Sequence, residues 1–186
     1  KTIDKFYKNF FLEINKLKKI DLDSVLSKFE KINYLSEFKF YSRNDKLFRY
    51  LRDIILNEEN YDSIMKLMMK NKKFNKKNVS KKLYFSKQDL KKINKQNHII
   101  GLHSYTHPTN MDKLSYKKQL LEYKKNKQFI EKELKCKVET MAHPCGKFNK
   151  NTIKVLKKLN IKLGFGISSN DNKNMFNISR LDSAYL

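Results

Sequence analysis

Residues 98–108 read His-Ile-Ile-Gly-Leu-His-Ser-Tyr-Thr-His-Pro, and the rest of the chain is interpreted around this stretch. The apolar run at 99–102 is short and β-branched and is followed by polar residues, which is typical of a buried strand. His103 and His107 then leave the carboxyl end of that strand as a loop, because Pro108 disfavours helical backbone in the residue before it. Two imidazoles at this spacing can face one point, and neutral imidazole is a common ligand of zinc-like metals.

The distribution of histidine and proline supports a site in this part of the chain. All four histidines lie between His98 and His143, and the two prolines, Pro108 and Pro144, each follow a histidine directly. A single histidine near a strand end is more often a hydrogen-bonded surface or core residue than a ligand, and we interpret His98 in that way. The spacing of the other pair favours metal binding, but it does not separate a catalytic metal from a structural one.

Two segments resemble motifs of one enzyme family, the polysaccharide deacetylases (NodB homology domain, carbohydrate esterase family four). Residues 101–108 resemble its His-[Ser/Thr]-x-x-His motif, and residues 141–149, Met-Ala-His-Pro-Cys-Gly-Lys-Phe-Asn, resemble its Pro-[Tyr/Cys]-Gly loop. The resemblance extends over about residues 82–182. It implies part of an irregular, TIM-like β/α barrel, and enzymes that remove acetyl groups from amino sugars with a divalent metal.

The resemblance also implies roles for the matching residues. His103 and His107 match the two histidine ligands of the metal, which we expect to be zinc, with cobalt, manganese or nickel as alternatives. Ser104 matches the small hydroxyl residue that steadies the ligand loop, a position that orients the imidazoles. The backbone N–H of Cys145 matches the group that helps to hold the oxyanion. A thiolate nucleophile at Cys145 is the alternative, because a cysteine close to a histidine can be activated in this way.

Further residues are expected to line the substrate site. Pro144 and Gly146 shape the turn of the second motif. His143 is predicted to act as an acid or a substrate contact, with an ordinary loop histidine as the alternative. Arg180 and Asp182 resemble a segment at the end of such domains and are expected to contact substrate.

Three features of the family pattern are missing from this sequence. A Thr-Phe-Asp-Asp-Gly-like segment, which supplies the third ligand and the catalytic base, does not occur, and we expect the chain to begin after that motif. Ala142 and His143 stand where an arginine is expected, and the late Leu-x-x-His motif is absent. Asp112, Asp171 and Asp182 are candidates for a replacement carboxylate, with helix caps or surface charges as the alternative.

The apolar pattern predicts two regions. Residues 1–80 are interpreted as a helical insertion or cap, because apolar residues recur at three- and four-residue steps as far as residue 71. Residues 81–186 are interpreted as a β/α core that begins after a charged connector at 71–82. The chain is therefore expected to belong to the α/β class.

Local signals divide the predicted core further. Three helices are expected to begin after caps at Ser86, at Ser115, and at Asn149 or Asn151. Strands are expected at 138–141, 162–168 and 176–181. Alternating strands and helices imply parallel pairing, which places both motif loops at the carboxyl edge of the sheet.

Composition limits the partners. The net charge of +23 comes almost entirely from lysine, since the chain has only four arginines: Arg43, Arg49, Arg52 and Arg180. We attribute this excess to AT-rich codons and expect no nucleic acid partner, although an anion-binding basic domain stays open as an alternative.

No run of about 18 apolar residues and no signal peptide occurs, so we expect no membrane span. Cys136 and Cys145 lack disulfide or CxxC spacing, which favours a cytoplasmic location.

The sequence thus predicts a metal-dependent enzyme, a hydrolase acting on C–N bonds other than peptide bonds. It would remove N- or O-acetyl groups from a carbohydrate, a bacterial surface polysaccharide or its precursor. The alternative is an inactive relative that binds carbohydrate or a partner protein.

Overall fold

The computed structural model describes residues 2–16, 20–167 and 174–180. The chain divides into two compact units, Lys1–Val79 and Ser80–Leu186. The division falls inside helix α5 (Lys76–Leu83), so the charged connector predicted at 71–82 contains a helix. None of the helices in the described part of the chain is long and apolar enough to cross a membrane.

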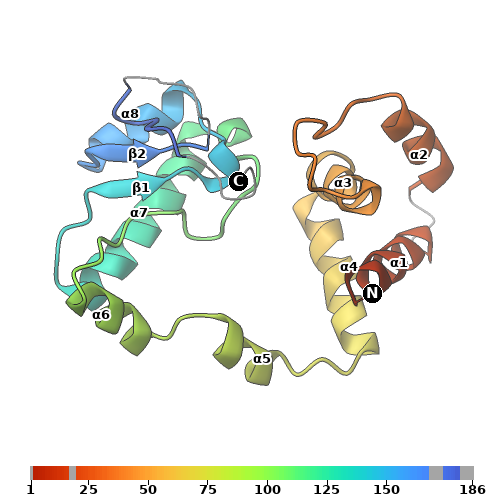
Figure 1. Cartoon of the computed structure of the whole chain (residues 1–186), viewed down its shortest axis with the longest axis horizontal. Coiled ribbons are helices and arrows are strands. Elements are labelled where there is room, and N and C mark those ends of the chain that lie inside the picture. Colours follow the sequence, from red (N-terminus) through yellow and green to blue (C-terminus); the bar gives the residue numbers. More distant parts are fainter. Residues whose placement is uncertain (1, 17–19, 168–173, 181–186) are drawn as a thin grey trace. The chain divides into compact units, whose positions relative to one another are not determined.

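The regular elements among the described residues of the first unit are helices, as the apolar spacing predicts (Figure 1). Side chains at Asp21, Ser42 and Asn57 each accept a backbone N–H bond from the first turn of a helix, which fixes where three of these helices begin. The elements are α1 (Thr2–Lys16), α2 (Leu22–Glu30), α3 (Arg43–Tyr50), the π-helical turn η1 (Leu51–Ile55) and α4 (Glu58–Asn71).

The core of the first unit is aromatic and aliphatic. Phe10 is fully buried, and its ring meets that of Phe48 edge to face at 4.8 Å between centroids. Ile54, which continues the predicted apolar face, is 49% exposed, whereas Leu56 is buried. The π turn η1 explains this difference, because an extra residue per turn rotates the following side chains away from the 3.6-residue pattern. The buried members are Phe10, Ile14, Val25, Phe29, Leu47, Tyr50, Leu51, Leu56 and Ile64.

The second unit alternates helices with short strands, and its predicted caps are confirmed. Ser86 and Asp89 form a reciprocal capping box, and the side chains of Ser115 and Asn149 accept bonds from the helices that follow them. The elements are α6 (Lys87–Lys95), the 3₁₀ turn η2 (Met111–Lys113), α7 (Tyr116–Leu134), β1 (Thr140–Ala142), the 3₁₀ turn η3 (Pro144–Gly146), α8 (Lys150–Lys158) and β2 (Leu163–Phe165).

A small parallel sheet lies in this unit, which confirms the predicted parallel pairing. β1 and β2 pair in parallel, with Met141 opposite Gly164. Leu102 extends the sheet on one side by a single parallel bridge to Met141, and Ile178 extends it on the other side by a parallel bridge to Phe165. The order is therefore Leu102, β1, β2, Ile178.

The strand predicted at 99–102 is wrong in its length. Only Leu102 is paired, donating its N–H to Thr140 O at 2.9 Å and accepting from Ala142 N–H at 2.8 Å. Ile99 is 82% exposed, because it lies before the paired residue and no described neighbour covers it. The strands predicted at 138–141 and 162–168 are present but shorter, as β1 and β2.

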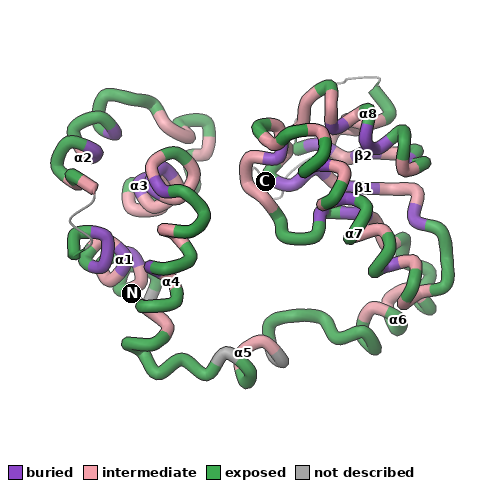
Figure 2. Tube along the Cα trace, turned by 180° about the vertical axis from the view of Figure 1, so that it is seen from behind, coloured by how far each residue is buried: buried purple, intermediate pink, exposed green. Residues whose placement is uncertain are grey.

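One apolar cluster holds the second unit together. Figure 2 shows its buried residues on α7, α8 and the sheet. Gly101 lies so close to β1 that a Cβ there would meet Thr140 Oγ1 at 2.8 Å. The buried members are Leu102, Met111, Tyr123, Ile130, Val138, Met141, Val155, Leu156 and Ile161. This packing fixes the positions from which both motif loops leave the sheet.

Candidate functional site

Both motif loops leave the same edge of the sheet. Leu102 and Met141 are paired in parallel, so the loop that begins at His103 and the loop that begins at His143 start side by side. A hydrogen bond of 2.9 Å between His103 Nδ1 and Ala142 O joins the two loops directly. The predicted meeting of the two motifs at the carboxyl ends of parallel strands is therefore what the structure shows.

The bond to Ala142 defines the chemical form of His103. A carbonyl oxygen only accepts, so Nδ1 carries the proton and Nε2 keeps its lone pair for a ligand. Partial loss of solvent around the ring is the main cause that lowers the pKa of His103. The bond to the Ala142 carbonyl raises that pKa in part, and the nearby His107 and Arg180 lower it. His103 is consequently neutral near pH 7, the form in which imidazole binds metals.

His107 lies beside His103, with 4.9 Å between ring centroids and 57° between ring planes. This separation allows both rings to contact one ion. Ser104 is buried, and its Oγ accepts the backbone N–H of His107 at 3.1 Å, which joins the two ends of the turn; its role in orienting the imidazoles stays a prediction. Ser104 and His107 both have left-handed backbone, with φ of 67° and 58°, which makes the turn tight.

Helix α7 holds the histidine loop through side chains that the sequence does not single out. Glu122 Oε2 accepts the backbone N–H groups of Tyr105 and Thr106 at 3.0 and 2.8 Å, and its Oε1 accepts the Thr106 hydroxyl at 3.0 Å. Asn126 Oδ1 accepts the backbone N–H of His103 at 3.0 Å. The one available signal was their four-residue spacing, which puts both side chains on one face of the helix.

The second loop is a sharp turn with an exposed tip. Pro144 is buried and Cys145 is exposed, with Cys145 in left-handed backbone at φ 51° and Gly146 at φ 65°. Gly146 N–H donates to His143 O at 3.0 Å, and a Cβ at Gly146 would lie 2.5 Å from Ile167 Cγ1. The turn therefore needs glycine at 146, while the oxyanion role of the Cys145 N–H stays a prediction.

His143 occupies a buried position between strands. Its ring is stacked on Phe148 at 4.3 Å, and Nε2 donates to Phe176 O at 2.6 Å. Nδ1 is buried without a hydrogen-bond partner among the described residues. Burial is the main cause that lowers the pKa of His143, so the ring is neutral. Its predicted role as an acid or substrate contact stays untested, and what the geometry shows is a ring that ties the segment at 176 to β1.

Of the remaining predicted residues, the structure describes Arg180 and Asp112 but not Asp171 and Asp182. Arg180 is exposed and donates from Nε to Gly166 O at 2.7 Å, and its charge lowers the pKa of both His103 and His143. Asp112 lies in η2 and is half-buried, with one carboxylate oxygen lacking a partner in the described structure. Asp171 and Asp182 lie outside the described residues.

The histidine pair fits part of a divalent metal site. Two imidazoles close together, one with its tautomer fixed by a carbonyl, are suitable ligands for zinc. Within residues 2–16, 20–167 and 174–180, no group of three or more His, Cys, Asp and Glu side chains is arranged to hold a metal. The described residues thus offer two ligands.

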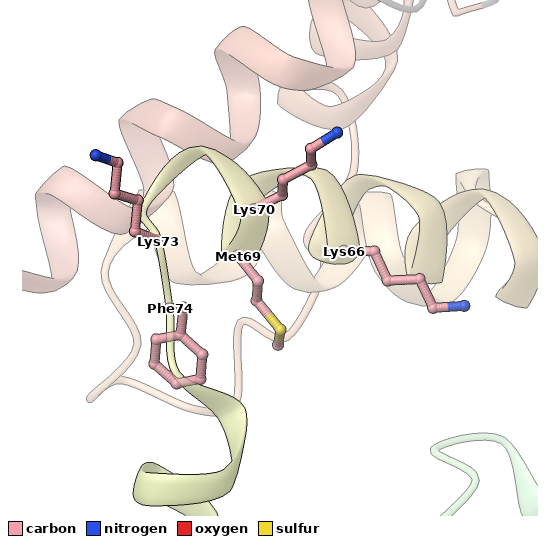
Figure 3. A pocket seen from close by; sticks show the side chains of 5 residues that line it. All are labelled: Lys66, Met69, Lys70, Lys73 and Phe74. Atoms are coloured by element: carbon pink, nitrogen blue, oxygen red, sulfur yellow. The ribbon is translucent and has the colours of Figure 1, made fainter.

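The first unit contains a pocket lined by lysines, which we compare with the alternative hypothesis of an anion-binding domain. Figure 3 shows it on the carboxyl end of α4, where the side chains of Met69 and Phe74 form its apolar part. The amino groups of Lys66, Lys70 and Lys73 extend in different directions instead of converging on one point. This pocket therefore gives no support to a phosphate site.

Comparison with known families identifies the class of protein. Residues 56–164, more than half of the chain, match the family model for polysaccharide deacetylases. The chain belongs to the polysaccharide deacetylase family. Its second unit is accordingly part of the irregular β/α barrel of that family, with the helical region before it. The matched range begins before residue 82 and ends before 182, so it differs at both ends from the resemblance in sequence.

Solved structures that are similar to part of this chain include a deacetylase and a pseudoenzyme. The deacetylase PplD of Streptococcus pyogenes, solved with acetate, is 22% identical with a TM-score of 0.49, over 52% of this chain and 44% of that one. A pseudoenzyme of carbohydrate esterase family four (CE4) from Bacillus anthracis is 29% identical with a TM-score of 0.39, over 40% of this chain and 26% of that one. The chain thus spans less than half the length of these relatives. A comparison with curated protein sequences gave no match.

Proposed function

We propose that the chain is a metal-dependent carbohydrate deacetylase that hydrolyses an N- or O-acetyl group on a bacterial surface polysaccharide or its precursor. The observation that carries this proposal is the adjacent His103–His107 pair, at the same sheet edge as the Pro-Cys-Gly turn. Zinc is the first candidate for the metal, with cobalt, manganese and nickel as alternatives. When bound, such a metal supplies Lewis acidity at the acetyl carbonyl and lowers the pKa of a bound water.

The chain's own residues supply binding and orientation. The Ala142 carbonyl keeps the proton of His103 on Nδ1, and Ser104 and Glu122 hold the loop between the ligands. The exposed turn that contains Cys145 lies at the same edge, and an N–H donor to the oxyanion is worth about 10²–10³ in rate. Attack by water also needs a general base. We assign that role to a carboxylate, and Asp112 is the candidate within the described residues.

The test is release of acetate from acetylated sugars, with N-acetylglucosamine oligomers and an O-acetylated polysaccharide as the two substrate classes. We expect release that requires added zinc and that is lost in the His103→Ala/His107→Ala variant. His98→Ala is the matched control, because this histidine is exposed and lies before the paired strand residue. Zinc-dependent release that survives in the double variant would refute the assignment of the ligands.

A second candidate function is a non-catalytic domain that binds carbohydrate. It is favoured by one observation, that the described residues bring only two ligands together. This function predicts no acetate release with any metal, while N-acetylglucosamine oligomers still perturb the NMR signals of the histidine loop. Acetate release alone therefore decides between the two candidates.

A further inference from the structure

One face of helix α7 contacts the histidine loop through hydrogen bonds to four backbone or side-chain groups and through one cation–π contact. Glu122 receives three bonds, from Tyr105 N–H, Thr106 N–H and the Thr106 hydroxyl. Asn126 receives the N–H of His103 at 3.0 Å. Lys125, between them on the same face, holds its ammonium group 5.5 Å from the centre of the Tyr105 ring. We call Glu122, Lys125 and Asn126 the α7 contact face.

The loop needs such support because its backbone is in an unfavourable conformation. Ser104 and His107 both adopt left-handed backbone, which residues other than glycine disfavour. Between them, two consecutive backbone N–H groups point at one carboxylate oxygen. A carboxylate acceptor makes these bonds shorter and stronger than a neutral acceptor would. Without it, Tyr105 and Thr106 have no other acceptor among the hydrogen bonds described for them.

The loop is also exposed, so packing does little to hold it. His103, Tyr105, Thr106 and His107 are all exposed, and Ser104 is its buried member. The adjacent side of α7 is anchored in the core, where Tyr123 is fully buried. The helix is therefore a rigid support, and the contact face transfers that rigidity to the loop.

We propose that Glu122 is a positioning residue for the metal site: its carboxylate fixes the loop so that His103 and His107 meet one ion, and Asn126 fixes the first ligand. This inference rests on the proposed function, because it assumes that the two histidines bind a metal. The inference adds Glu122 as the residue that determines how tightly the two histidines bind the metal. Groups that orient metal ligands typically contribute about 10–100-fold in metal affinity.

The experiment is a titration of the full chain with Co²⁺, followed by the visible absorption bands of the bound ion. Glu122→Ala is expected to weaken Co²⁺ binding about 10–100-fold and to change the band pattern. Glu122→Gln is expected to lie between Ala and wild type, because its amide oxygen can still accept the two N–H bonds without the charge. Glu133→Ala is the matched control, since Glu133 lies on the same helix and pairs with Lys87 and Lys91.

A metal-free measurement keeps the inference separate from the proposed function. Hydrogen exchange of the Tyr105 and Thr106 amides is expected to be faster in Glu122→Ala and unchanged in Glu133→Ala. Wild-type affinity and bands in Glu122→Ala, or an equal loss in Glu133→Ala, would overturn the inference. If the wild type binds no Co²⁺, the proposed function fails and so does the role in metal affinity. Unchanged amide exchange in Glu122→Ala would then also remove its role in holding the loop.

Discussion

Replacing Gly146 by alanine tests the geometry of the second motif loop. Gly146 has φ of 65°, and a Cβ there would lie 2.5 Å from Ile167 Cγ1 and 2.8 Å from Ile167 Cδ1. The substitution therefore has two separate consequences, a backbone penalty at Gly146 and a displacement of the Ile167 side chain.

The magnitude follows from these two terms. Left-handed backbone costs an alanine about 1–2 kcal/mol. The lower entropy of the unfolded alanine chain offsets about 0.4–1 kcal/mol of this penalty. Ile167 is 42% exposed and can move, so its displacement adds about 0.5–1.5 kcal/mol, the cost of an off-rotamer side chain. We expect Gly146→Ala to lower the free energy of unfolding by about 0.5–3 kcal/mol.

Urea unfolding of four proteins separates the two terms: wild type, Gly146→Ala, Ile167→Ala and the double variant. In the Ile167→Ala background the displacement is absent, so the added penalty of Gly146→Ala should fall to about 1 kcal/mol. A Gly146→Ala protein as stable as wild type would refute the left-handed turn. An unchanged penalty in the Ile167→Ala background would refute the overlap with Ile167.

Three further predictions concern the second unit. Thr152→Val should cost about 1–3 kcal/mol in urea unfolding, because Thr152 is fully buried and donates to Gln119 Oε1 at 2.6 Å; a change under about 0.5 kcal/mol would contradict this bond. Leu156→Ala should cost about 2–5 kcal/mol, since Leu156 is fully buried, whereas Leu121→Ala at a 51% exposed site should stay within about 0.5 kcal/mol. Burial lowers the pKa of His143, so below about pH 6.5 the unfolded chain binds more protons and stability is lost as the pH falls. His143→Gln should reduce the loss measured between pH 7 and 5.5, and an equal loss would contradict the neutral buried ring.

Local chemistry made much of the second unit predictable. Caps at Ser86, Ser115 and Asn149 depend on a side chain a few residues from the backbone it serves, so the sequence locates the first two and limits the third to Asn149 or Asn151. Parallel pairing followed from the alternation of strands and helices. The two motif loops share one edge because Leu102 and Met141 pair in parallel, a consequence of that same topology.

Other features depend on contacts between distant residues. The length of a strand depends on its neighbours, and Ile99 has the composition of a strand residue but no described partner. The support of the histidine loop by Glu122 joins residues 16 and 17 positions apart, and a glutamate on a lysine-rich helix looks like an ordinary surface charge. The burial of His143 under Phe148 likewise depends on how the loop folds back, which residue type does not specify.

Calorimetric titration with Zn²⁺ tests most directly whether His103 and His107 form one metal site. We expect wild type and His98→Ala to bind zinc equally, and His103→Ala, His107→Ala and the double variant each to lose that binding. Burial lowers the pKa of His103, so zinc should displace few protons from this ring near pH 7. Equal zinc uptake by wild type and the double variant would contradict the account, since the two rings would then lie together without acting as ligands.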